Sequence, residues 1–144
     1  MMVVDASVCV SLLLSEDVHH DTSLAWLQPR LVAGWSFFAP SLLIAEVAGG
    51  IARRTGLSAD GHRAVAGLRE LMDIALVPLD LERAAMSARL AADLRLRGAD
   101  ATYVAIALEV GVPLVTWDRE QLTRAAEIIS VFTPASAHQD ELSS

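Results

Sequence analysis

The sequence contains no lysine, so all 11 of its basic side chains are arginine. Chemistries that need a lysine are therefore excluded, among them phosphate binding by a P-loop, Schiff-base formation, and phospho-aspartate receiver or dehalogenase-type sites. Asp5 directly follows the first predicted strand of an α/β pattern. For a protein with an aspartate at that position, these exclusions reduce the number of candidate functions.

The chain has one cysteine, Cys9, which excludes an intramolecular disulfide and a zinc site built from cysteines. Cys9 lies in an apolar run, and we expect a buried thiol there. The four histidines lack metal-ligand spacing and stand in polar or turn-like contexts, so we expect them at the surface. They are His19, His20, His62 and His138.

Long hydrophobic runs are also missing. The longest apolar stretch, residues 37–52, contains Glu46 and two glycines, whereas a membrane-spanning helix needs about 20 largely uncharged residues. The N-terminus has no basic region, and Asp5 comes too early for a signal peptide. We therefore expect a cytoplasmic protein without a membrane segment. Its high apolar content, 53% with a mean hydropathy of +0.43, predicts a subunit or partner interface.

A chain of 144 residues fits one domain with one core. We assign residues 1–134 to this domain and residues 135–144 to a polar tail that is expected to be flexible. The net charge of −7 argues against a protein that holds nucleic acid by bulk electrostatics alone.

Apolar segments with two different periods alternate along the chain. Strands are predicted at residues 2–4, 37–39, 74–77, 113–116 and 128–132. Helices are predicted at residues 8–15, 20–32, 41–55, 58–73, 80–97, 99–110 and 118–126, with Ser7 and Ser41 as N-caps and Gly98 as a helix stop. This alternation predicts an α/β fold with a mainly parallel central sheet of about four to five strands, flanked by helices on both faces.

Four acidic residues stand out by their positions. Asp5 follows the first predicted strand and Asp118 follows the fourth, and open α/β sheets bind ligands beyond the carboxyl ends of their strands. Glu46 lies in a helix that is apolar nearly all round, where a carboxylate is costly unless it is paired or metal-bound. Asp100 repeats this pattern on the helix face that carries Tyr103.

Each acid also has a purely structural interpretation. Asp5, Asp100 and Asp118 could each cap the helix that follows, and Glu46 could pair with Arg53. Together, however, four such carboxylates would repel one another and raise one another's pKa unless cations neutralise them. Hard, oxygen-liganded Mg²⁺ or Mn²⁺ suits such a site.

Four segments, in order, resemble the PIN-domain pattern. They are residues 3–7 (VVDAS), 41–47 (SLLIAEV), 98–105 (GADATYVA) and 114–118 (LVTWD). Their order and spacing are similar to those of VapC-type toxins of bacterial toxin–antitoxin pairs. The resemblance spans residue 3 to about residue 133, and it implies a PIN-like fold and hydrolysis of RNA phosphodiester bonds.

The resemblance also implies roles for individual residues. The four acids fall on the metal-binding acids of the family, and Glu46 would either bind a metal or orient the attacking water. Thr116 falls on a position whose hydroxyl supports the site, and Ser7 matches a small polar residue near the first aspartate. The implied cofactor is Mg²⁺, with Mn²⁺ as an alternative. The implied partners are an RNA substrate, a second copy of the chain and a VapB-like antitoxin that covers the acidic cleft.

Basic and aromatic residues near the predicted acidic edge are candidates for contacting RNA. The arginines are Arg53, Arg54, Arg95, Arg97 and Arg119, any of which could instead be a solvated surface residue. Trp117 could stack on a base, although packing against the protein is the alternative. Three other functions stay open: a catalytically inactive PIN-like module that binds a protein or RNA, a metal-dependent DNA nuclease, and a phosphatase.

Overall fold

A computed structural model describes residues 1–136 of the chain. It contains one five-stranded sheet in the order β3-β2-β1-β4-β5, and every pairing of neighbouring strands is parallel. The strands are β1 (Met2–Val4), β2 (Phe37–Pro40), β3 (Ile74–Val77), β4 (Leu114–Val115) and β5 (Val131–Phe132). Most of the predicted tail, residues 137–144, lies outside the described residues.

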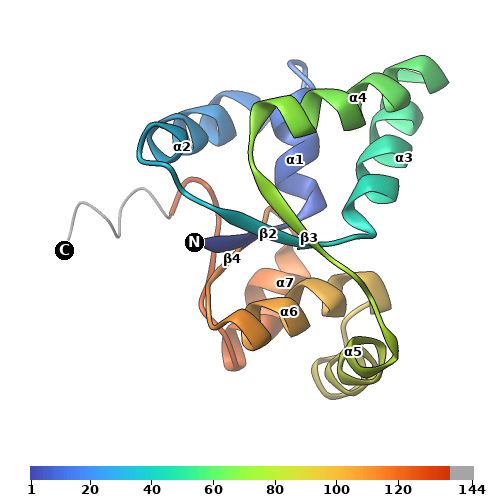
Figure 1. Ribbon diagram of the computed structural model, residues 1–144, viewed down its shortest axis with the longest axis vertical. Helices are drawn as coiled ribbons and strands as arrows, with labels where there is room; N and C mark the ends of the chain where they lie inside the picture. Colours follow the sequence, from blue (N-terminus) through green and yellow to red (C-terminus); the bar gives the residue numbers. More distant parts are fainter. Residues whose placement is uncertain (137–144) are drawn as a thin grey trace.

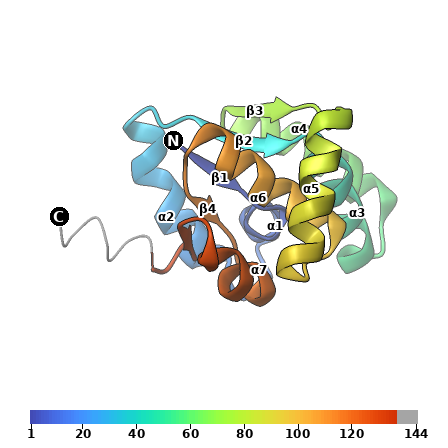
Figure 2. The ribbon, with the colours of Figure 1, turned by 90° about the horizontal axis from the view of Figure 1, so that it is seen from below.

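Helices cover both faces of this sheet (Figure 1). They are α1 (Ala6–Leu13), α2 (His20–Val32), α3 (Leu43–Thr55), α4 (Ser58–Leu71), α5 (Leu81–Leu94), α6 (Gly98–Val110), α7 (Arg119–Arg124) and the short 3₁₀ helix η1 (Ala125–Glu127). Helices α1–α4 pack on one face and α5–α7 on the other, and Figure 2 shows this second layer from below. The predicted α/β fold is confirmed. Within the described part of the chain, no helix has the length and apolarity needed to cross a membrane.

The strand order creates a crevice beside β1. The chain runs from β1 to β2 and β3 on one side, and then returns to place β4 and β5 on the other side. The carboxyl ends of β1 and β4 therefore form the topological switch point at which open α/β sheets bind ligands. Val4 pairs with Val115, so Asp5 and Thr116 follow their strands at the same level of the sheet.

Helix α6 is buried along most of its length. Every residue from Asp100 to Ala107 is buried, which matches its mainly apolar sequence. Full burial of each large apolar side chain contributes about 1.5–3 kcal/mol. Because packing holds this helix against the sheet, it also holds the one carboxylate in its first turn, that of Asp100, at a set position.

Two predicted N-caps are wrong. Helix α1 is capped by Asp5, whose side chain accepts a hydrogen bond from the backbone N–H of Ser7, so α1 begins two residues earlier than predicted. Helix α3 begins at Leu43 without a side-chain cap, although Ser41 was predicted to cap it. The backbone N–H of Ser41 instead continues the sheet by donating to the carbonyl of Val77.

The predicted stop at Gly98 is also wrong. Helix α5 ends at Leu94, and Arg95 adopts the left-handed conformation with φ of 55°. The N–H groups of Arg95 and Leu96 both donate to the carbonyl of Ala91, and Leu96 is buried. Burial of Leu96 accounts for the early turn, because an apolar contact just beyond a helix end accompanies this type of termination. Gly98 then becomes the first residue of α6.

The last predicted strand is shorter than expected because the chain turns before it. The N–H groups of Ile128 and Ile129 both donate to the carbonyl of Ala125, at 3.0 Å each. These bonds close the end of η1 and are unavailable to a sheet, so β5 contains only Val131 and Phe132.

Candidate active site

Asp5 is a buried carboxylate in the crevice at the end of β1. Its Oδ2 accepts hydrogen bonds from the N–H of Ser7 at 3.0 Å and from Oγ1 of Thr116 at 3.1 Å. Burial raises the pKa of the Asp5 carboxyl above its usual value, the hydrogen bonds from Ser7 and Thr116 oppose that rise, and the charge of Asp118 adds to it. Asp5 therefore caps α1 and is also desolvated, so the capping interpretation does not exclude a functional one.

Thr116 connects three of the polar groups around Asp5. Its fully buried hydroxyl lies 2.7 Å from Oε1 of Gln121 and 3.3 Å from Oγ of Ser7, and it accepts a hydrogen bond from the N–H of Asp118 at 3.0 Å. The predicted supporting residues, Ser7 and Thr116, thus both lie next to Asp5. A single hydroxyl joins the segment after β4 to the segment after β1.

Gln121 also contributes to the site, a role that the sequence analysis did not assign to it. Its backbone N–H does donate to Oδ1 of Asp118 at 2.8 Å, so Asp118 caps α7 as predicted. The buried side chain, however, points inward, with Nε2 3.4 Å from Oδ1 of Asp5 and 3.3 Å from the carbonyl of Asp100. The one sequence signal for a role of Gln121 is its position three residues after Asp118, an aspartate that caps a helix.

Glu46 and Tyr103 form a pair that no sequence pattern predicted. The tyrosine ring is fully buried in α6, and its hydroxyl donates to Oε1 of Glu46 at 2.6 Å. Partial burial raises the pKa of Glu46, the hydrogen bond from Tyr103 opposes the rise, and the charges of Asp5 and Asp100 add to it. A buried tyrosine hydroxyl needs a partner, and here that partner is Glu46, whose alternative pairing with Arg53 is not observed.

Asp100 and Asp118 are joined by Arg97. Nε of Arg97 lies 3.1 Å from Oδ2 of Asp100, and its Nη2 lies 3.4 Å from Oδ2 of Asp118. Burial raises the pKa of the Asp100 carboxyl, the charge of Asp118 raises it further, and Arg97 opposes both effects. The charges of Asp100 and Asp118 raise the pKa of Arg97 in turn.

The four predicted acids therefore meet in one region, although they come from four separate segments. Charge repulsion links Asp5 with Asp118, Glu46 with Asp5 and Asp100, and Asp100 with Asp118. The donor types suit a hard divalent cation. As the side chains stand, however, no three acids, histidines or cysteines within residues 1–136 are arranged to hold a metal ion together.

A groove of about 530 Å³ lies along α1 and α3, and Glu46 is the member of the acidic cluster that lines it. Its lining includes Ser7, Glu46, Arg53, Arg54 and Trp117. Both arginines are exposed. Nη1 of Arg54 forms an ion pair with Asp17, whereas Arg53 makes no ion pair within residues 1–136.

Trp117 packs against the protein on one side. Its ring stacks on His19 with centroids 3.8 Å apart and planes 8° apart. Its Nε1 donates to Oγ of Ser23, and its backbone N–H donates to Oγ of Ser7. His19, which was predicted to lie at the surface, thus covers one face of the Trp117 ring. The remaining candidates, Arg95 and Arg119, are exposed at the end of α5 and the start of α7.

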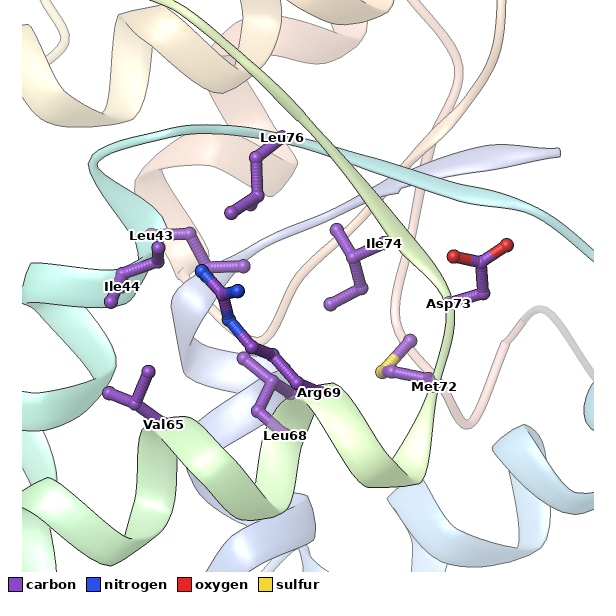
Figure 3. A pocket seen from close by; sticks show the side chains of 9 residues that line it. All are labelled: Leu43, Ile44, Val65, Leu68, Arg69, Met72, Asp73, Ile74 and Leu76. Atoms are coloured by element: carbon purple, nitrogen blue, oxygen red, sulfur yellow. The ribbon is translucent and has the colours of Figure 1, made fainter.

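A second hollow, of about 250 Å³, lies between α3, α4 and β3 (Figure 3). Its walls are mainly apolar. Figure 3 shows Arg69 reaching from α4 toward Leu43 and Ile44, while the carboxylate of Asp73 points away from the hollow. None of the four clustered acids lines it, so this hollow is not the candidate active site.

Comparisons with known proteins agree with this geometry. The family model of the PIN domain matches residues 2–128, and no curated protein sequence gave a significant match. PAE2754 from Pyrobaculum aerophilum is 23% identical, with a TM-score of 0.66 over 99% of this chain and 96% of that protein. A chain of a toxin–antitoxin complex from Klebsiella pneumoniae is 20% identical, with a TM-score of 0.67 over 93% of this chain and 98% of that chain. VapC20, a sarcin–ricin-loop-cleaving toxin from Mycobacterium tuberculosis, is 17% identical, with a TM-score of 0.65 over 90% of this chain and 96% of that protein. At these identities, the likeness shows a shared fold.

Proposed function

Because the chain belongs to the PIN domain family, as its motifs predicted, we propose that it is a metal-dependent ribonuclease. PIN domains are generally nucleases. One observation carries the proposal: four carboxylates from separate segments converge at the carboxyl edge of the sheet and repel one another. Proteins avoid such a concentration of buried negative charge unless a cation or a reaction requires it.

Each acid has a role in this proposal. Asp5, Asp100 and Asp118 would hold Mg²⁺ or Mn²⁺, and a bound ion supplies an activated water and stabilises the leaving oxygen. Glu46 would bind the metal or orient the water as a general base, and its hydrogen bond from Tyr103 holds the carboxylate in one position. Ser7, Thr116 and Gln121 would orient Asp5 through the hydrogen bonds described above.

The groove beside Glu46 is our candidate path for single-stranded RNA. Glu46 and Arg53 lie on one face of α3, seven residues and about 10 Å apart along the helix axis. Gly50 lies between them and lines the groove without adding a side chain. Arg53 is exposed there and carries no ion-pair partner within the described residues, so it is available to meet a phosphate. Arg54 would have to leave Asp17 to do the same.

Replacement of Arg53 tests this path. Arg53→Gln is expected to weaken binding of a fluorescent single-stranded RNA and to make the plot of log affinity against log salt less steep by about 0.7, the value for one lost phosphate contact. RNA binding is measured by fluorescence anisotropy in the Asp5→Asn background, so that the RNA stays intact. Arg89→Gln, which replaces another exposed arginine, on α5, is the matched control. Equal salt slopes for both variants would contradict the proposed path.

We also propose that this nuclease is the toxin of a toxin–antitoxin pair that acts on cytoplasmic RNA. The similarity to the toxin–antitoxin complex from Klebsiella pneumoniae supports this assignment. In this proposal a VapB-like antitoxin covers the acidic cleft, and two copies of the chain form a homodimer. Light scattering tests the dimer. Co-purification with the product of the adjacent reading frame, with loss of RNA cleavage in the complex, tests the antitoxin. A chain that cleaves RNA freely and binds no such partner is not a toxin of this type.

Cleavage of a mixed RNA pool tests the central proposal. The purified, EDTA-treated chain is incubated with Mg²⁺, with Mn²⁺ or with chelator alone, and a DNA pool of matched sequence is run beside the RNA. We expect metal-dependent cutting of RNA that leaves 5′-phosphate and 3′-hydroxyl ends. Cutting of DNA alone would assign a DNA nuclease. No cutting of cellular RNA by a folded, partner-free chain would favour the inactive binding module.

A further inference from the structure

Arg97 holds together two of the four clustered acids. It lies just before α6, and its side chain is 73% exposed. One guanidinium contacts Asp100, in the first turn of α6, and Asp118, at the N-cap of α7. Its charge also opposes the rise in the pKa of Glu46. A single cation at the rim of the site therefore acts on three carboxylates.

No other arginine within residues 1–136 forms an ion pair with any of the four acids. In the described part of the chain these acids are not arranged to hold a metal ion together, and the guanidinium of Arg97 stands between two of them. Arg97 contacts Oδ2 of both carboxylates, and Oδ1 of Asp118 already accepts the N–H of Gln121, so a divalent cation held by Asp118 would compete with Arg97 for Oδ2. The two cations therefore compete for these carboxylates.

We propose that Arg97 is an intramolecular counter-cation that a divalent metal ion must displace in order to bind. The inference rests on the proposed function, because it takes the four acids as the metal site. Displacement is feasible since Arg97 is mostly exposed and surface ion pairs are weak. Once released, the guanidinium remains tethered beside the site, where it can contact a phosphate of the substrate. Arg97 can therefore contact Asp100 and Asp118 in the metal-free protein and RNA in the metal-bound protein.

Metal affinity without substrate tests the inference. Free Mn²⁺ is measured by electron paramagnetic resonance while it is titrated into the wild type, Arg97→Gln and Arg119→Gln. Arg119 is exposed next to Asp118 and forms no ion pair within residues 1–136, so its variant changes the net charge equally without removing the competing contacts. We expect Arg97→Gln to bind Mn²⁺ about three- to tenfold more tightly than the wild type, and Arg119→Gln to change the affinity by less than twofold.

Displacement itself is observable with diamagnetic Mg²⁺. The ¹⁵Nε resonance of Arg97, assigned by its absence in Arg97→Gln, is expected to shift as Mg²⁺ saturates the wild type. An unmoved resonance at saturation, or equal Mn²⁺ affinities of the wild type and Arg97→Gln, would overturn the inference while leaving metal-dependent cleavage intact. Absence of Mn²⁺ binding by all three proteins would instead overturn the metal-dependent function, and the inference with it.

Discussion

Asp5→Asn is expected to reduce RNA cleavage by about a hundred- to a thousandfold while making the protein more stable. Loss of one precisely oriented charged group from an electrostatic site costs activity on this scale. The amide keeps the size of the carboxyl and can still accept hydrogen bonds from Ser7 and Thr116. It removes a buried charge that Asp118 repels. We expect a gain of about 1 kcal/mol in the free energy of unfolding at neutral pH.

The pH dependence of this gain follows from the raised pKa of Asp5. A carboxyl whose pKa is higher in the folded state contributes stability below its unfolded pKa, and this contribution is lost as the pH rises through the folded value. A charged Asp5 therefore destabilises the wild type only at pH values above the folded pKa, whereas asparagine is neutral at every pH. The difference in melting temperature, measured in EDTA, should be larger at neutral pH than near pH 3.8, the ordinary aspartate value.

Asp93→Asn is the matched control for Asp5→Asn. Asp93 is exposed on α5, so its variant changes the net charge equally and is expected to leave both cleavage and stability unchanged. Loss of activity with a gain in stability is typical of a residue kept for function rather than for folding. If Asp5→Asn cleaved RNA as fast as the wild type, the acidic cluster would not be the nuclease site.

Thr116→Val is expected to lower the free energy of unfolding by about 2–4 kcal/mol. Valine keeps the shape of threonine but removes the hydroxyl, so the single hydroxyl proton within reach of both Asp5 and Gln121 is lost, and the N–H of Asp118 loses its acceptor. Leaving one such buried group unsatisfied costs about 1–3 kcal/mol. RNA cleavage should fall as well, because the segments that carry Asp5 and Asp118 lose the hydroxyl that joins them.

Urea denaturation of Thr116→Val and Thr116→Ser in EDTA separates the hydroxyl from the methyl group. Serine retains the hydroxyl and removes one buried methyl, which costs about 1 kcal/mol. We expect Thr116→Ser to retain most of the stability and cleavage that Thr116→Val loses. Equal losses in the two variants would mean that Thr116 acts through packing of its methyl group and not through its hydrogen bonds.

The sequence by itself determined the layered fold and the convergence of the acids. Alternating apolar periods predicted a parallel sheet between helices, and the carboxyl ends of parallel strands share one edge. With the pairing of β1 and β4 that the structure shows, this relation brings Asp5 and Asp118 together without any knowledge of side-chain contacts. Glu46 and Asp100 stood out as carboxylates on apolar helix faces, the PIN-domain motifs implied a metal-binding role for all four acids, and the family match confirmed the resemblance.

Only the tertiary structure decided which side chains surround these acids. Thr116 reaches Asp5 across 111 positions of sequence, and Tyr103 reaches Glu46 across 57. Local periodicity identifies the face of a helix or strand, but not the distant atom that completes a buried hydrogen bond. For the same reason, Arg97 could be predicted as a basic residue near the acidic edge but not as the cation that joins Asp100 to Asp118. That contact exists because packing brings the starts of α6 and α7 together around one guanidinium.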